Sequence, residues 1–518
     1  MWFLIFLRDF VGLPAFLVAI FALIGALLQR KKLNEIVTSV FKVIVGFLIL
    51  GAGAGVLIGS LNQFQPLFES AYSLQGIIPN NDAFSGLLAN VLPKMGSLAS
   101  LIMIVGMIMN LILAGFSRFR YVFVSGHMLY YLGLMLSGVF YKIGFDFENN
   151  PADFVISLFG GAAILSLYMA ISPAMMQRYT RTITGTDEFG LGHTGSFGYA
   201  ISGVIGEAVG KLRKGKITST EAINFPKQLF FLRNILVSIT LTIFIFYMLA
   251  FIPSGVMYEL GHYTQVVDGR TVPKVGKEVI VGILSTRNWF VEMLIQAFTF
   301  TAGVEIILVG VRMFIGELVP LFKGISEKFI KRAKAAVDCP VLFPYAQNAV
   351  LIGFISSFLG GIVGLGITIG LSQGAFIPAV ILPGLVPHFF LGATNGIYGN
   401  AKGGYLGAIL AAFTVGILIT FVPIIFILGQ WVPGANKELE AIAIQNGGES
   451  QLDGLRTLNW GDTDYTLGII PGVLGLINKW VGFAFALVVY GLLIIDGILL
   501  KFVPWWPRRK TPVAVETK

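Results

Sequence analysis

The sequence has few charged residues and only one cysteine. Charged residues make up 12% of the 518 residues, whereas hydrophobic residues make up 56%. A soluble domain carries roughly 25% charged residues, so this composition excludes a soluble enzyme, a disordered chain and a collagen-like fibre. The single cysteine, Cys339, excludes a disulfide framework and a CxxC metal site. The class that remains is a polytopic membrane protein.

Basic residues outnumber acidic ones, and the formal net charge is +9. In membrane proteins basic residues collect in the loops that stay on the cytoplasmic side, so we attribute the charge to topology and expect no nucleic-acid partner. The glycine-rich run around His193 has no GK[ST] triplet and is therefore no nucleotide-binding loop. We expect no cofactor and no resident metal.

Long apolar runs predict membrane-spanning helices of about 20 residues each. Ten runs are clear, and an eleventh at 375–392 is interrupted by Pro378, Pro383 and Pro387. The runs do not alternate, which excludes a membrane β-barrel. The predicted fold is an all-α polytopic membrane protein with about 11 transmembrane helices. The ten clear runs are 10–29, 37–61, 95–116, 121–143, 152–176, 235–254, 290–318, 340–371, 404–429 and 469–500.

Charge placement predicts the orientation: the N-terminus lies outside and the C-terminus in the cytoplasm, which requires an odd number of spans. Together with the apolar runs, the charge placement divides the chain into seven segments. These are an N-terminal helix (1–34), a first repeat with a cytoplasmic Gly-His loop (35–234), a linking helix with an external insert (235–288), a second repeat (289–429), an acidic external loop (430–468), the last transmembrane helix (469–506) and a basic cytoplasmic tail (507–518).

A short internal similarity suggests that the two repeats are inverted. GVLIGSLNQFQPLFESAYS and GVRMFIGELVPLFKGISEK each end an apolar run in Pro-Leu-Phe, at Pro66 and Pro320. The charge rule gives these two segments opposite orientations, as in transporters whose substrate site lies between inverted repeats. The segment 77–94 is too short and too polar to span, and the segment 376–403 is broken by proline and glycine. We therefore expect re-entrant structure that lines a site, with ordinary external loops as the alternative.

Three residues are the main candidates for chemistry. His127 lies in a predicted span, where an ionisable group indicates function, although a helix-packing histidine fits as well. Glycines surround His193, whose loop offers free N–H groups to an anion or a sugar; a flexible loop is the alternative. Asp338 starts a span and either caps it or accepts a proton from a sugar hydroxyl. Asn348 offers an amide to a polyol, and Cys339 is interpreted as an inert small hydrophobe.

These motifs resemble a known family. GVRMFIGELVPLFKGISEKFI, AVDCPVLFPYAQNAVLIGF, SGHMLYY and LGHTGSF together resemble the membrane component, enzyme IIC, of the L-ascorbate-type bacterial phosphotransferase system, which is related to the galactitol type. The likeness covers most of residues 35–425. It implies inverted repeats, eleven membrane helices, a homodimer in the lipid of the bacterial inner membrane, and elevator-like movement of a core domain.

The resemblance also implies group translocation. The permease binds L-ascorbate or a related sugar acid or polyol, and a phosphocysteine on a separate enzyme IIB phosphorylates it, with IIA, HPr and enzyme I upstream. No phosphorylated domain is recognised in this sequence, so the phosphate is expected from partner proteins. Asp338 and His193 are the implied catalytic residues. The implied substrate-binding set is His127, Tyr131, His193, Thr194, Asp82, Asp338 and Asn348.

The sequence departs from the family pattern near both histidines. Thr194, Gly195 and Ser196 follow His193 where the family has glutamines, and Tyr131 stands where it has another glutamine. Lost amides change which hydroxyls can be recognised, so the substrate stays open. An ion-coupled secondary transporter that leaves its substrate unmodified is the alternative function. A channel is a third interpretation, and the absence of a repeated pore motif counts against it.

Overall fold

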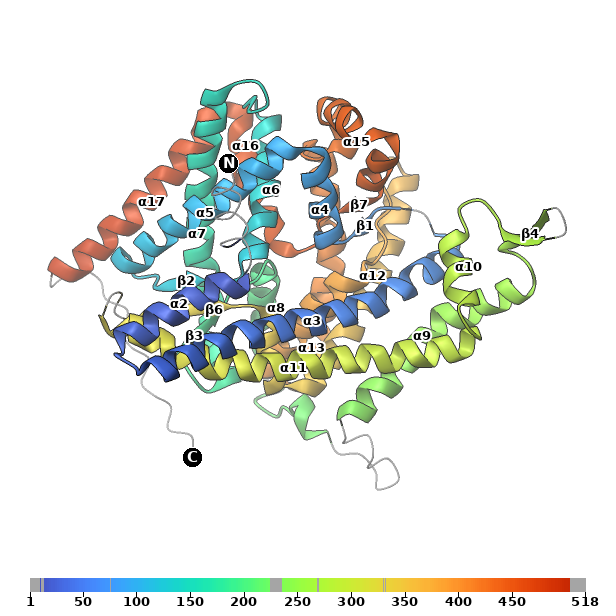
Figure 1. Ribbon diagram of the computed structural model, residues 1–518, viewed down its shortest axis with the longest axis horizontal. Coiled ribbons are helices and arrows are strands. Elements are labelled where there is room, and N and C mark those ends of the chain that lie inside the picture. The colour runs from blue at the N-terminus through green and yellow to red at the C-terminus, as the bar shows by residue number, and fades with distance from the viewer. Residues whose placement is uncertain are drawn as a thin grey trace.

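Helices make up most of the computed structural model, which describes residues 10, 14–74, 76–223, 235–267, 270–328, 330 and 332–503 (Figure 1). The predicted tail, 507–518, lies outside the described residues. The α-helices are α2 (Pro14–Leu28), α3 (Leu33–Ala71), α4 (Asn81–Val91), α5 (Pro93–Phe116), α6 (Gly126–Lys142), α7 (Pro151–Thr184), α8 (Ser196–Leu212), α9 (Ile235–Glu259), α10 (Glu278–Ser285), α11 (Trp289–Lys328), α12 (Gln347–Gln373), α13 (Leu385–Thr420), α14 (Val422–Gly429), α15 (Lys437–Thr457), α16 (Ile469–Ile477) and α17 (Lys479–Phe502).

Short strands and 3-10 helices connect these helices. The strands are β1 (Ile78–Pro79), β2 (Tyr121–Phe123), β3 (Phe189–Leu191), β4 (Thr264–Val267), β5 (Arg270–Pro273), β6 (Lys334–Val337) and β7 (Leu458–Asn459). The 3-10 helices are η1 (Thr220–Ala222), η3 (Cys339–Tyr345), η4 (Pro433–Ala435) and η5 (Thr463–Gly468). Within the described residues, 7 helices are long and apolar enough to cross a membrane. The predicted class, an all-α polytopic membrane protein, is confirmed.

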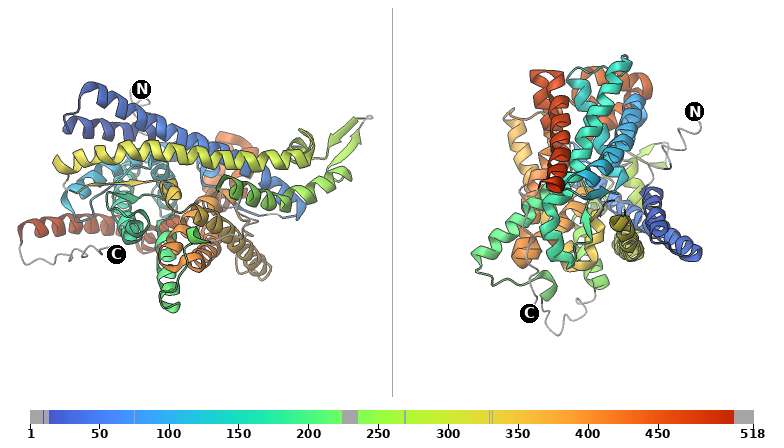
Figure 2. Two further views of the ribbon diagram at one scale, coloured as in Figure 1. Left: turned by 90° about the horizontal axis from the view of Figure 1, so that it is seen from below. Right: turned by 90° about the vertical axis from the view of Figure 1, so that its left-hand side faces the viewer.

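The two longest apolar helices, α3 and α11, lie side by side and run in opposite directions (Figure 2). Near one end of the pair, Ser39 Oγ donates a hydrogen bond to Glu317 at 2.8 Å. Further along, Ser60 Oγ donates to the carbonyl of Gln296 at 2.8 Å, so residue numbers rise along α3 as they fall along α11. The two Pro-Leu-Phe segments therefore lie at opposite ends of the helix pair.

The proline-rich span predicted at 375–392 is displaced towards the C-terminus. Residues 374–384 are not helical, and α13 begins at Leu385, with Pro387 in its first turn where proline is tolerated. Gly404 then breaks α13 with φ 60° and ψ −158°. A Cβ on Gly399 would lie 2.7 Å from the Cβ of Ala411, which a straight helix rising 1.5 Å per residue could not produce. The two halves of α13 therefore fold back on each other.

Two other predicted spans are interrupted. The run 121–143 begins as strand β2, and its helix, α6, starts only at Gly126. His127 therefore lies in the first turn of a helix, whereas the sequence predicted a position inside a span. The run 469–500 is divided between α16 and α17. Asn478 separates them in an extended conformation, and its side chain accepts a hydrogen bond from the backbone N–H of Trp480 to begin α17.

Three broken segments from distant parts of the chain meet. Strand β1 pairs in parallel with β7, and Ile77 bridges to Ile381. Trp460 Nε1 donates to Ser85 Oγ of α4 at 2.8 Å. The segment 430–468, predicted as an acidic loop, instead holds α15 and a buried stretch, in which Asp462 is 1% and Asp464 0% exposed. The prediction fails for this stretch because protein hydrogen-bond donors replace water around the carboxylates.

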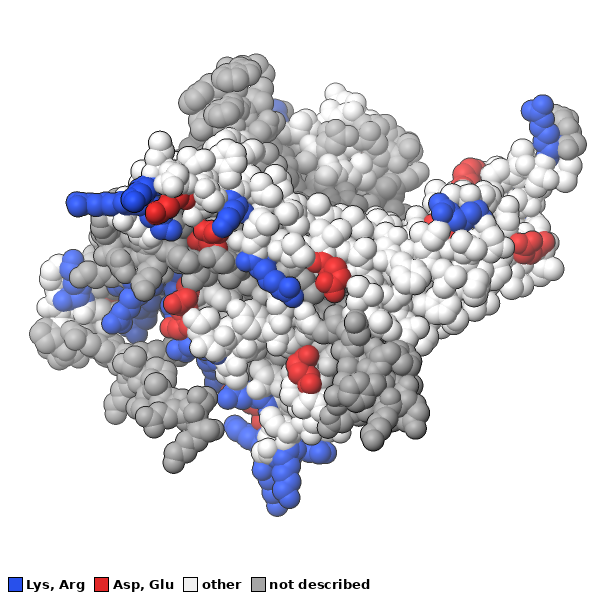
Figure 3. All heavy atoms as spheres, turned by 60° about the horizontal axis from the view of Figure 1, so that its bottom comes forward, with Lys and Arg blue, Asp and Glu red and all other residues white. Residues whose placement is uncertain are grey.

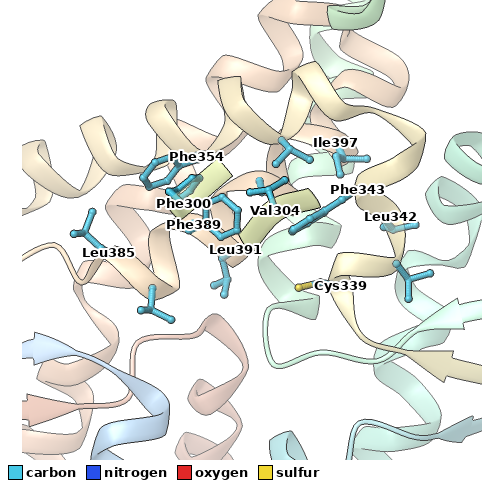
Figure 4. Close-up of a cluster of buried hydrophobic side chains, with 14 of the residues drawn as sticks. Phe300, Val304, Cys339, Leu342, Phe343, Phe354, Leu385, Phe389, Leu391 and Ile397 are labelled. Atoms are coloured by element: carbon cyan, nitrogen blue, oxygen red, sulfur yellow. The ribbon is translucent and has the colours of Figure 1, made fainter. Parts of the chain in front are cut away.

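An aromatic core beside these segments fixes η3, the element that follows Asp338. Phe389 of α13 lies at the centre, with ring centroids 5.2 Å from Phe300 and 5.4 Å from Phe354. Phe343 of η3 packs edge-on against Phe389 at 6.0 Å. Cys339 faces the same apolar cluster and is fully buried (Figure 4). This packing holds the start of η3 against α11, α12 and α13.

Candidate functional site

A small parallel sheet brings the three principal candidate residues together. Its strand order is β2-β6-β3, with β6 pairing in parallel with both neighbours. His127 follows β2, Asp338 follows β6 and His193 follows β3. Because the carboxyl ends of parallel strands meet at one edge of a sheet, the three side chains converge there. Sequence reasoning did not predict these strands.

An ion pair fixes the other end of the sheet. Lys334, the first residue of β6, lies 2.5 Å from Asp187, which precedes β3. Gln177 Nε2 donates to the same carboxylate at 2.9 Å. Burial raises the pKa of Asp187, but hydrogen bonds from Lys334 and Gln177 outweigh it, so the pKa lies below its ordinary value. The strands are thus tied together at the end away from the candidate site.

Asp338 lies between the two histidines. His127 Nε2 is 3.7 Å from one carboxylate oxygen, and His193 Nε2 is 3.8 Å from the other. Both separations are too long for a direct hydrogen bond. A substrate hydroxyl oxygen can, however, lie about 2.8 Å from the histidine nitrogen and from the carboxylate oxygen at the same time, and so bridge either pair. Asp338 also caps η3, since its Oδ1 accepts from the Cys339 backbone N–H at 2.6 Å. The capping and site-lining interpretations of Asp338 are therefore compatible.

The surroundings of His193 determine which ring nitrogen carries the proton. The backbone N–H of Gly195 donates to His193 Nδ1 at 3.0 Å, and the hydroxyl of Tyr199 lies 2.9 Å from the same atom. Nδ1 is therefore an acceptor, and in the neutral ring the proton sits on Nε2. His193 thus presents an N–H donor towards Asp338. His193 is 2% exposed, so the contacts of its Nδ1 are shielded from water.

The same cluster has the residue types of a metal site. Ligand atoms of His193, Asp338 and Cys339 all lie within 4.8 Å of one another. A neutral histidine ligand coordinates through an unprotonated nitrogen and donates from the other. Here the nitrogen that faces the cluster carries the proton, so the arrangement favours recognition of hydroxyl groups over coordination of an ion.

A hydrogen bond connects the two histidine motifs. Ser125 Oγ donates to the carbonyl of Gly192 at 2.8 Å, so the residue before the Gly-His helix motif binds the glycine of the Gly-His loop. Gly192 also lies close to the central strand, because a Cβ there would lie 2.9 Å from the carbonyl oxygen of Ala336. Only glycine permits this approach without displacement of the backbone. The glycine therefore serves the packing that brings His193 to Asp338.

The remaining predicted residues divide into two groups. Tyr131 packs edge-on against His127 with ring centroids 6.0 Å apart, and Thr194 follows His193 directly. Asn348 is engaged elsewhere, since its amide donates to the carbonyl of Thr220 at 3.1 Å. Asp82 lies in the first turn of α4, but its side chain is outside the described residues. The structure thus joins Tyr131 to the cluster, whereas the buried Thr194 hydroxyl donates to Asp462 and the Asn348 amide donates to η1.

Two buried carboxylates beside the site were missed by sequence reasoning. Asp462 accepts a hydrogen bond from the hydroxyl of Thr194, and Asp464 contacts the first turn of α8. Both come from the segment predicted to be a solvated loop. The signal that was available is the apolar context of the run NWGDTDYTLGII, in which two aspartates lie between aromatic and aliphatic residues.

Comparison with known proteins identifies the family of the chain. Residues 9–437 match the family EIIC-GAT, described as the PTS system sugar-specific permease component. The chain is also 26% identical over 439 residues to the "Ascorbate-specific PTS system EIIC component" of Mycoplasma pneumoniae (strain ATCC 29342 / M129 / Subtype 1). That match covers 80% of this chain and 65% of the relative's length, so the chain spans less than two thirds of the relative. The chain belongs to the EIIC-GAT family of sugar-specific permease components of the phosphotransferase system.

Proposed function

We propose that this protein binds L-ascorbate or a related sugar acid or polyol between His127, His193 and Asp338 and delivers it for phosphorylation. The convergence of two imidazole Nε2 atoms on one carboxylate carries the proposal. Alternating donors and acceptors at these spacings suit neighbouring hydroxyl groups of a polyhydroxy compound. The ascorbate-specific name of the Mycoplasma pneumoniae relative supports the same substrate class.

In the proposed reaction Asp338 acts as the base and His193 as a donor. A phosphocysteine on enzyme IIB approaches, the sulfur–phosphorus bond breaks and an oxygen–phosphorus bond forms to the sugar hydroxyl. The hydroxyl proton passes to the Asp338 carboxylate, and the cysteine leaves as a thiolate. His193 presents a protonated Nε2 and therefore orients the substrate instead of accepting the proton. IIA, HPr and enzyme I would resupply the phosphoryl group.

A basic surface supports the proposed IIB partner. Lys and Arg side chains gather on the lower and left-hand parts of the face in Figure 3. The last turn of α8 and the residues that follow it hold the exposed Lys211, Arg213, Lys214 and Lys216. These residues are at the C-terminal end of α8, whose first turn follows His193. Positive charge there attracts an anionic phosphoprotein. Anionic lipid headgroups carry the same sign and are the competing partner.

The wider mechanism forms part of the same proposal. The antiparallel α3 and α11, with a Pro-Leu-Phe segment at opposite ends of the pair, support two inverted repeats around the site. Elevator-like movement of the part that carries the sheet would then expose the substrate to each side in turn. A homodimer in the bacterial inner membrane, with the N-terminus outside and the C-terminus in the cytoplasm, completes the proposal.

Substrate binding tests the proposal without any partner protein. Purified protein is heated with L-ascorbate, with related sugar acids and with polyols, and the melting temperature is recorded. We expect one of these compounds to raise it in the wild type and to raise it less in His193→Ala at the same concentration. Equal shifts in both proteins, or none with any compound, would place the substrate elsewhere or outside this class. Uptake into vesicles separates group translocation from ion-coupled transport of an unmodified solute.

A further inference from the structure

The segment that follows β7 runs directly behind the His193 loop. Three consecutive residues of this segment, Asp462, Thr463 and Asp464, contact the loop and the start of α8. The Asp464 backbone N–H donates to the carbonyl of Thr194 at 2.8 Å. Thr463 Oγ1 accepts from the N–H of Gly198 at 3.1 Å. A stretch far away in the sequence thus holds the loop through both backbone and side-chain groups.

Asp464 caps helix α8 from outside that helix. Its two carboxylate oxygens accept hydrogen bonds from the backbone N–H groups of Ser196 and Phe197, both at 2.8 Å. The residue at the local N-cap position is Gly195, which has no side chain to do this. An aspartate at a helix N-terminus satisfies unpaired N–H groups and interacts favourably with the helix dipole. The first turn of α8 therefore depends on a carboxylate from another segment.

The same carboxylate is connected to His193 through a tyrosine. The hydroxyl of Tyr168 lies 2.6 Å from Asp464 Oδ2 and 2.9 Å from the carbonyl of His193. Ser196 Oγ donates to that same carbonyl at 2.6 Å. The Tyr168 hydroxyl has one proton and can donate it to only one of these two acceptors at a time, so Ser196 supplies the constant hydrogen bond to the His193 carbonyl. Asp464 contacts both Ser196 and Tyr168. Asp464 is fully buried, so water does not compete for these contacts.

We infer that Asp464 is a positioning residue of the sugar site. Asp464 holds the His193 loop so that the imidazole Nε2–H faces Asp338, and it contacts no substrate itself. Loss of one acceptor leaves a buried N–H at the start of α8 unpaired, and the loop that ends at this turn shifts. The inference rests on the proposed function for its substrate readout, but the geometry of His193 can be tested without a substrate.

The test replaces Asp464 with asparagine, which keeps the size but offers one acceptor oxygen in place of two. In phosphorylation assays with enzyme IIB we expect the KM for the sugar to rise about tenfold, because a buried N–H left unpaired displaces the His193 loop. The maximal rate at saturating sugar should stay within about twofold, because the reacting groups remain in place. The control is Asp496→Asn, which removes a carboxylate that pairs with Arg118 away from the site.

A second readout keeps the inference separate from the proposed function. Diethyl pyrocarbonate modifies accessible histidines, and mass spectrometry measures how fast His193, which is 2% exposed in the wild type, reacts. We expect faster modification in Asp464→Asn and no change in Asp496→Asn. If Asp464→Asn does not fold, Tyr168→Phe carries the same test, because it removes only the hydroxyl between Asp464 and His193.

Two results would overturn the inference. One is an unchanged KM together with an unchanged His193 modification rate in a folded variant. The other is a variant in which the apparent affinity for the sugar, the maximal rate and the melting temperature all fall in proportion. That result indicates a loss of stability alone. If the wild type binds and phosphorylates no sugar, the proposed function fails, whereas the His193 modification rates still decide whether Asp464 positions the loop.

Discussion

His193 and Asp338 face each other across 3.8 Å between Nε2 and Oδ1, with the histidine proton directed at the carboxylate. The adjacent ends of strands β3 and β6 produce this relationship, and a substrate hydroxyl can bind to both groups at once. The carboxylate is the base in the proposed transfer. A substitution can remove the ability of Asp338 to accept a proton and still keep its hydrogen bond from the Cys339 backbone N–H.

Asp338→Asn makes that separation. The asparagine side-chain oxygen still accepts from the Cys339 N–H, but an amide does not accept the hydroxyl proton. We expect sugar phosphorylation to fall roughly 10²- to 10⁴-fold, the usual contribution of a general base, while expression and melting temperature stay near those of the wild type. Phosphorylation at the wild-type rate would show that another group takes the proton.

His193→Ala removes the donor that faces Asp338. We expect the affinity for the sugar to fall about 10- to 100-fold, because a hydrogen bond between a substrate and a charged or buried site contributes roughly 1.5–3 kcal/mol. Isothermal titration with the compound found by thermal shift measures this change. His262→Ala is the matched control, because His262 is exposed in the insert and away from the sheet. Equal losses in the two variants would contradict a specific role for His193.

Asn348→Ala tests a residue that the sequence assigned to the substrate. Its amide donates to Thr220, so we expect a loss of about 1 kcal/mol in unfolding free energy and no more than about a twofold change in KM. Thermal denaturation and uptake kinetics measure the two effects. A large rise in KM at an unchanged melting temperature would return Asn348 to the substrate-binding set.

Gly404→Ala tests the reversal of α13. Gly404 has φ 60°, and a Cβ there would lie 2.3 Å from the carbonyl oxygen of Thr218. We expect a lower melting temperature, since backbone strain of this kind costs on the order of 1–3 kcal/mol before the clash is added. Gly366→Ala serves as the control, because a Cβ at Gly366 meets nothing within 4 Å. Identical stability of the two variants would contradict the folded-back arrangement.

Much of the fold and the centre of the candidate site could be predicted from the sequence. Long apolar runs identify membrane helices, because the bilayer demands their length and composition. His127, His193 and Asp338 were selected as ionisable groups in apolar or glycine-rich surroundings, and the structure brings them together. The strands that align them were not predicted, because strands of three or four residues show no readable alternation.

Other features depend on contacts between distant segments and were therefore not predictable. The apolar run around Asp462 and Asp464 indicates burial, but it does not show which groups would pair with the two carboxylates. Their burial is possible only because Thr194, Ser196 and Phe197 supply donors from another part of the chain. Likewise, the sequence could not show that the amide of Asn348 donates a hydrogen bond to the carbonyl of Thr220.

Uptake into membrane vesicles distinguishes group translocation from transport of the unmodified sugar. Vesicles that contain this protein receive isotopically labelled sugar, with or without phosphorylated enzyme IIB inside and with or without an ion gradient. We expect labelled sugar phosphate to appear inside only when phosphorylated IIB is present, and Asp338→Asn to lower it roughly 10²- to 10⁴-fold. Accumulation of free labelled sugar driven by the ion gradient, with no sugar phosphate formed, would contradict group translocation.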